Sequence, residues 1–316
     1  MKTPIIATTG MLLMLVAVVA PPDAAAHDNR GGACNATTRA AYSACLFSTL
    51  DTYQLGVGKC RNEADSADRD VCLDDARDAL QEENALCRDQ REARDDLCDA
   101  LGQAPYDPRF ESGDFVDPRE IGRSIAPNPW FPLKAGRTLV YESKDETVTV
   151  TITDEVKVID KVPCLVVRDV VEVDGELLED TTDWFAQDVR GNVWYCGEAT
   201  AEYEGGIPVN VDGSFQADVD GARPGMIMKA APAVGDVYRQ EFDLGNAEDV
   251  AKVVGLNGSA TVPAGRCAGN CLVTEEFTPL SPGATENKYY QPGVGLILQT
   301  KPGSSDRLQL VKIIDR

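Results

Sequence analysis

Residues 147–153 read TVTVTIT, and residues 164–173 read CLVVRDVVEV. β-Branched side chains dominate both stretches, and their alternation with a period of two is typical of β-strands. Asp174-Gly175 follows the second stretch, and this dipeptide favours a tight turn between paired strands. We therefore predict that residues 128–316 form an antiparallel β-meander, rolled into a half-barrel, a barrel or a sandwich.

The same signals recur through the rest of this region and predict about a dozen short strands in all. Further strands are expected at residues 181–187, 192–196, 237–242, 250–254, 259–262, 272–277, 288–291, 295–299 and 308–314. The pattern of a long amphipathic helix does not occur between them, so the C-terminal region is predicted to be all-β.

Four segments of this region carry a resemblance to known proteins. They read NPWFPL at 128–133, DWFAQD and GNVWY between 183 and 195, VPAG at 262–265, and KYYQPGVGL at 288–296. These segments resemble a group of uncharacterised secreted bacterial β-rich proteins and are loosely similar to the envelope lipoprotein carriers and related lipid-binding half-barrels. The resemblance implies an extracytoplasmic β domain with a concave apolar face, and it implies no catalytic residue.

Six cysteines in the N-terminal region have successive spacings of 11, 15, 12, 15 and 11, which read the same in both directions. In an antiparallel helical hairpin that turns near residues 64–67, two residues lie opposite each other when their residue numbers add up to the same value. Nested disulfides require this arrangement. The predicted pairs are Cys34 with Cys98, Cys45 with Cys87, and Cys60 with Cys72. Residues 27–103 are thus predicted to be an acidic, disulfide-stapled α-helical hairpin, which makes the whole chain α+β in two parts.

The second arm of this hairpin has the clearer helical pattern. Between Cys72 and Leu101, apolar residues recur at spacings of three and four, and acidic residues fill the opposite face. Ser66 or Asp68 is expected to cap its N-terminus, because hydroxyl and carboxylate oxygens accept hydrogen bonds from the first free amides.

The remaining four cysteines belong to the β-rich region. Cys267 with Cys271, and Cys164 with Cys196, are the expected disulfides, because an exported chain meets oxidising conditions. A zinc site built from these four thiolates is the alternative, although the spacing is not that of a standard zinc knuckle. An even number of cysteines requires no free thiol and therefore no cysteine nucleophile.

The two regions are joined by a proline-rich stretch at residues 104–127, and the chain starts with export signals. Because aromatic residues accompany the prolines, the stretch is predicted to be a linker packed on a domain. Residues 1–26 have the basic start, apolar centre and A-x-A end of a signal peptide, with an uncleaved anchor as the alternative. We expect a secreted or periplasmic protein that begins at His27 and has no transmembrane segment after cleavage.

Composition excludes several classes of function. With 30 Lys and Arg residues against 52 Asp and Glu residues, the formal charge is −22, which disfavours nucleic acids and anionic membranes as partners. His27 is the single histidine, so the mature domains lack the imidazole of a Ser-His-Asp triad or of a multi-histidine metal site. No cofactor motif occurs, and we expect neither a cofactor nor a resident metal.

One cluster in the β-rich region is a candidate ligand site, formed by Trp184, Gln187, Trp194 and Tyr195. Its aromatic side chains can stack on a sugar or line an apolar groove, and large aromatics can equally be core residues. Asp183 and Asp188 flank the cluster and supply the two carboxyl groups that a glycosidase needs.

These observations favour a non-enzymatic exported binding or structural protein. Its expected partner is a small apolar ligand, an envelope component or another protein. One alternative is a secreted glycan hydrolase that uses two carboxyl groups, and the other is a protein that binds divalent metals on its acidic surface.

Overall fold

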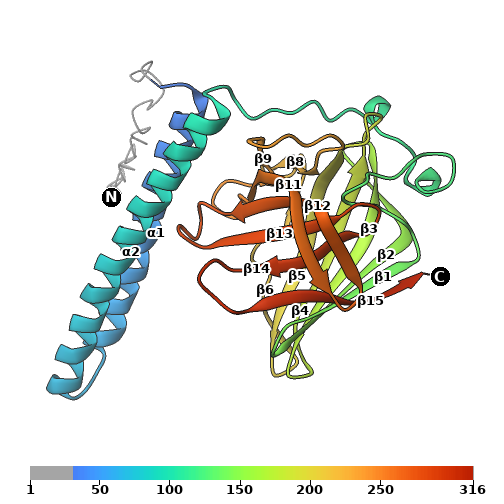
Figure 1. The fold of residues 1–316 in the computed structure, drawn as a ribbon. Coiled ribbons are helices and arrows are strands. Elements are labelled where there is room, and N and C mark those ends of the chain that lie inside the picture. Colours follow the sequence, from blue (N-terminus) through green and yellow to red (C-terminus); the bar gives the residue numbers. More distant parts are fainter. Residues whose placement is uncertain (1–30, 316) are drawn as a thin grey trace, which may run out of the picture.

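The computed structural model describes residues 31–315. The expected signal peptide at residues 1–26 and the expected N-terminal His27 lie outside the described residues. Figure 1 shows a long pair of helices beside a barrel-shaped β-sheet, with an extended segment between them. The predicted fold class is confirmed, since a stapled helical hairpin precedes a large antiparallel meander.

The hairpin consists of α1 (Ala33–Arg61) and α2 (Ser66–Leu101). The N-cap of α2 is Asp65, where the sequence favoured Ser66 or Asp68. The Asp65 carboxylate accepts hydrogen bonds from the backbone amides two and three residues later, which satisfies donors that have no partner within the helix.

Ten cysteines form five disulfides, and no cysteine among residues 31–315 is free. The hairpin contains Cys34–Cys98, Cys45–Cys87 and Cys60–Cys72, and the sheet contains Cys164–Cys196 and Cys267–Cys271. These are the pairs that the sequence predicts, and the nested set has Cα–Cα distances of 5.5–5.8 Å. Five disulfides are consistent with an oxidising, extracytoplasmic location.

Fifteen strands within the described residues form one antiparallel sheet. They are β1 (Arg137–Glu142), β2 (Glu146–Ile159), β3 (Val162–Val173), β4 (Glu176–Gln187), β5 (Val193–Glu204), β6 (Ile207–Asn210), β7 (Phe215–Gln216), β8 (Arg223–Met228), β9 (Val237–Arg239), β10 (Glu241–Phe242), β11 (Val250–Val262), β12 (Gly265–Phe277), β13 (Thr285–Gln291), β14 (Gly295–Thr300) and β15 (Arg307–Asp315). Their spatial order runs β10-β8-β5-β4-β3-β2-β1-β15-β14-β13-β12-β11-β9, with β6 and β7 paired to β5. Several strands are longer than expected, and the sequence did not predict β1, β6, β7 or β8.

The sheet closes almost completely into a barrel, because β9 and β10 are consecutive in the chain but pair with opposite edges. β9 pairs with β11, and β10 pairs with β8. Gln240 lies between them and passes so close to Gly225 of β8 that a Cβ on Gly225 would be 1.9 Å from the Gln240 carbonyl oxygen. Only glycine therefore fits at position 225, and the backbone contact there completes the barrel.

The barrel has an apolar interior, and a smaller apolar cluster covers part of its outer surface. The outer cluster packs Phe110 and Phe115, from the segment between hairpin and barrel, against Trp184, Trp194 and the Cys164–Cys196 disulfide. This disulfide joins β3 to β5 across β4. The short 3₁₀ turns η2 (Ser112–Asp114) and η3 (Pro118–Glu120) belong to the same segment, residues 102–136, which we call the covering segment. None of the helices within residues 31–315 is long and apolar enough to span a membrane.

Candidate functional site

A cavity of about 310 Å³ lies inside the barrel and is the candidate functional site. Most of its wall is apolar, and the strands contribute these side chains at alternate positions, as the pleat requires. The apolar lining residues are Phe131, Leu133, Leu139, Val148, Val150, Ile152, Val167, Phe185, Ile227, Val294, Leu296 and Leu308. A concave, largely apolar wall of this kind is typical of a site for a small organic ligand.

Carboxyl groups interrupt this apolar wall. The cavity is lined by Asp169, Asp183, Glu241, Asp249 and Glu276, with Lys288 as the basic residue among them. They come from strands on both sides of the barrel, because β3 and β4 carry the first two and β12 and β13 carry Glu276 and Lys288. Closure of the sheet brings them together.

Lys288 forms an ion pair with one of these carboxylates, that of Glu276. Its Nζ lies 2.7 Å from Oε2 of Glu276, whose Oε1 accepts hydrogen bonds from Thr274 Oγ1 at 2.8 Å and from the Tyr290 hydroxyl at 2.9 Å. Burial alone would raise the pKa of Glu276, but Lys288 and the two hydroxyl donors outweigh burial and lower it. Glu276 and Lys288 therefore form a neutral unit, and the other carboxyls have no cation of their own in the cavity.

Asp183 and Glu198 are bridged by one phenol. The Tyr195 hydroxyl contacts the Asp183 carboxylate and lies 3.0 Å from Oε2 of Glu198. A phenol carries one proton, so both contacts are hydrogen bonds only when one carboxyl is protonated and donates to the phenol oxygen. Burial, reinforced by the charge of Asp169, raises the pKa of Asp183, and burial also raises the pKa of Glu198 to about 7.

Asp169 is the unsatisfied group of the cavity. Its Oδ1 is buried and has no hydrogen-bond partner among the described residues. Burial raises the pKa of Asp169 to about 7, Glu179 adds to this effect, and Lys288 opposes it. A buried acceptor without a donor costs free energy, and a ligand that supplies a donor at this point recovers it.

The structure separates the residues that the sequence grouped as a ligand site. Tyr195 lines the cavity together with Asp183 and stacks on Phe185 with a centroid distance of 4.6 Å. Trp184 and Trp194 belong to the outer apolar cluster, where Lys157 Nζ lies 3.2 Å from the centroid of the Trp184 ring.

Gln187 and Asp188 hold the chain in place outside the cavity. Gln187 accepts a hydrogen bond from the Asn128 amide and donates one to the Ala126 carbonyl, which fixes the covering segment. Asp188 accepts from the backbone amide and side chain of Asn192 and from the Trp194 indole. Asp183 and Asp188 therefore do not share a site.

Asp169, Glu276 and Lys288 were not singled out from the sequence. One signal was present, since Asp169 lies two residues after Val167 and so shares its inward face within an apolar strand. Such a position marks a buried charge that needs a partner. Within residues 31–315, no three His, Cys, Asp or Glu side chains are grouped so that they could hold a metal ion.

Comparisons of the chain with protein-family models, with curated proteins and with solved structures find no match. The function is therefore inferred from the geometry of this chain alone.

Proposed function

We propose that this protein is an exported binding protein whose barrel holds one small ligand with an apolar body and a hydrogen-bond-donating, preferably cationic, end. The observation that carries the proposal is the unpartnered oxygen of Asp169 in a cavity whose wall is largely apolar. The five disulfides support a secreted or periplasmic location, and the apolar wall supports a small organic ligand.

The charge balance of the cavity favours a cationic end. Glu276 neutralises Lys288, which leaves Asp169, Asp183 and Glu241 facing the same space without a basic partner. Burial raises the pKa of each of the three, and nearby carboxyl charges add to that effect; a bound ammonium group would oppose both by favouring the ionised carboxylates. A primary amine on an alkyl or aryl body satisfies both parts of the cavity.

The two alternatives from the sequence have less support. A glycan hydrolase that uses Asp183 and Asp188 would need both carboxyl groups at one site, but the oxygens of Asp188 hold a turn outside the cavity. A divalent-metal protein would need converging ligands, and the described residues contain no such group.

Titration with n-octylamine tests the proposal, with n-octanol as the neutral counterpart. We expect saturable binding of the amine by the full-length protein, measured calorimetrically at pH 8, which is above the pKa of about 7 that burial gives Asp169. Asp169→Asn should weaken it at least about tenfold, the range for loss of a charge-assisted hydrogen bond. Asp180→Asn removes the same charge from the outer face of the same strand pair and should change the affinity less than about twofold.

Equal effects of the two variants, or no saturable binding of the amine, would contradict the proposal. Native mass spectrometry of protein purified from its producing cells gives an independent check. A non-covalent adduct that contains an amine and is lost from Asp169→Asn supports the proposal, and a purely anionic adduct that is lost from Asp169→Asn contradicts it.

A further inference from the structure

A second cavity, of about 320 Å³, lies where the helical hairpin, the segment after it and the barrel meet. We call it the junction cavity. The end of α2, the first residues after it and strands β8, β9 and β10 border it, and Tyr106, Trp194, Met226 and Phe242 form apolar or aromatic walls. It contains none of the residues that line the barrel cavity.

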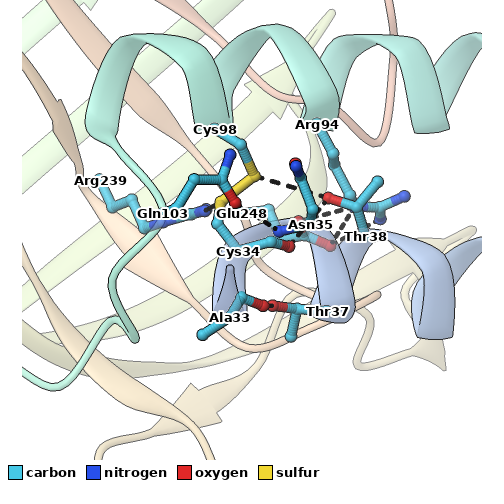
Figure 2. The surroundings of a disulfide bond; sticks show 10 residues. All are labelled: Ala33, Cys34, Asn35, Thr37, Thr38, Arg94, Cys98, Gln103, Arg239 and Glu248. Carbon is cyan, nitrogen blue, oxygen red and sulfur yellow. Dashed lines mark hydrogen bonds and ion pairs between the residues drawn. A yellow bond between two sulfur atoms is a disulfide. The ribbon is translucent and has the colours of Figure 1, made fainter. Parts of the chain in front are cut away.

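Two buried guanidinium groups lie near one carboxylate at this junction, and only one of them is paired with it. Arg94 of α2 donates to both oxygens of Glu248, at 2.9 Å from Nε and 2.6 Å from Nη2. Arg239 of β9 lies beside this pair near the Cys34–Cys98 disulfide (Figure 2) and forms no ion pair with any residue between 31 and 315. The cluster therefore carries a net positive charge, although the protein as a whole has a formal charge of −22.

The surroundings of Arg239 do not compensate this charge. Its side chain stacks on two rings, with the guanidinium carbon 4.7 Å from the centroid of Phe242 and 5.6 Å from that of Tyr106. Burial lowers the pKa of Arg239, Glu248 opposes that change, and Arg94 adds to it. Stacking holds the guanidinium plane in place but supplies no anion.

One charged hydrogen-bond donor beside the junction cavity has no acceptor among the described residues. It is Nη1 of Arg239, a residue that borders the cavity and is only 8% exposed. Nη2 of Arg239 reaches no closer acceptor than Sγ of Cys34, at 3.9 Å. Buried donors without acceptors cost free energy, and the cost is larger when the donor is charged.

We propose that the junction cavity binds a small organic carboxylate with an aromatic or alkyl body. The carboxylate would neutralise Arg239 and accept hydrogen bonds from its guanidinium group, and the body would pack on Trp194, Phe242 and Tyr106. The apolar walls favour such a ligand over inorganic phosphate or sulfate, which would lose hydration without gaining apolar contacts. The site does not depend on the barrel cavity, and it lies near the Arg94–Glu248 ion pair that joins the hairpin to the barrel.

Binding of sodium benzoate to the full-length protein tests the proposal, with benzyl alcohol as the neutral counterpart. We expect saturable benzoate binding by calorimetry and a change in fluorescence from Trp194, which lines the cavity. Arg239→Met should weaken benzoate binding at least about tenfold. Arg266→Met removes an exposed charge from the barrel, and Asp169→Asn alters the other cavity, so both should leave benzoate affinity within about twofold.

A second variant keeps the test decisive if Arg239→Met does not fold, as judged by circular dichroism. Ala104 is exposed and lines the junction cavity, so Ala104→Trp fills the space without removing a charge and should also abolish benzoate binding. The proposal is overturned if benzoate and benzyl alcohol bind equally well, if benzoate does not bind up to about 10 mM, or if Ala104→Trp binds it like the unmodified protein.

Discussion

Arg94 of the helical hairpin and Glu248 of the barrel form a buried ion pair that joins the two parts of the molecule. The side chains are 6% and 1% exposed, and Glu248 Oε1 also accepts a hydrogen bond from the Gly245 amide at 2.8 Å. Nearby, Gln90 of α2 donates a hydrogen bond to the Leu280 carbonyl at 2.9 Å. The hairpin is thus held on the barrel by specific polar contacts, and one of them is fully desolvated.

Glu248→Gln should destabilise the protein more than Arg94→Met does. The first change leaves both Arg94 and Arg239 buried without a carboxylate, at a cost of about 3–5 kcal/mol, whereas the second leaves Glu248 close to Arg239. Urea denaturation with the disulfides intact, followed by tryptophan fluorescence and by far-ultraviolet circular dichroism, measures both losses. Arg91→Met serves as the control, because Arg91 is exposed and its loss should cost less than about 1 kcal/mol.

Asp169→Asn should stabilise the protein at pH 8 and have little effect at pH 4. The folded-state pKa of Asp169 is raised to about 7, so the folded state binds more protons than the unfolded state between about pH 4 and pH 7. The unmodified protein therefore loses stability as the pH rises through this interval, and asparagine removes that contribution. Thermal unfolding of both proteins from pH 4 to pH 8 checks the direction of this pH dependence. A difference in melting temperature that stays constant with pH would show that Asp169 does not titrate in this range.

Gly225→Ala should weaken the closure of the barrel. The new methyl group would lie 1.9 Å from the Gln240 carbonyl oxygen, so the backbone of β8 or of the β9–β10 segment has to move. We expect a loss of at least about 2 kcal/mol in unfolding free energy. Gly58→Ala is the matched control, because Gly58 lies inside α1 with no atom within 4 Å of its added Cβ, and alanine there should stabilise by about 0.5–1 kcal/mol. Similar losses in both variants would mean that Gly225 is not a steric requirement.

The parts of the fold that depend on local pattern follow from the sequence, and the parts that depend on closure do not. The palindromic cysteine spacing specifies an antiparallel hairpin, and the apolar spacing of three and four residues in its second arm makes that hairpin helical. The composition of the cavity depends on which strands meet across the barrel. Asp169 and Lys288 lie on opposite sides of the sheet order, and no local signal relates them. The structure divides the aromatic cluster for a similar reason, since Trp194 and Tyr195 are adjacent in sequence and face opposite sides of β5.

Lys288→Met should destabilise the protein strongly at pH 8, because it leaves Glu276 as an uncompensated buried charge. We expect a loss of about 3–5 kcal/mol. In the unmodified protein the pKa of Glu276 is lowered, so this carboxylate stabilises the fold above its unfolded-state pKa, and that contribution is lost as the pH falls. Without Lys288 burial dominates and the pKa of Glu276 rises, so the stability of the variant should instead improve as the pH falls towards 5.

Adding Glu276→Gln removes the buried charge, and the double variant should recover at least half of the loss at pH 8. If the double variant is as unstable as the single one, packing of the lysine stem, and not the charge of Glu276, accounts for the effect.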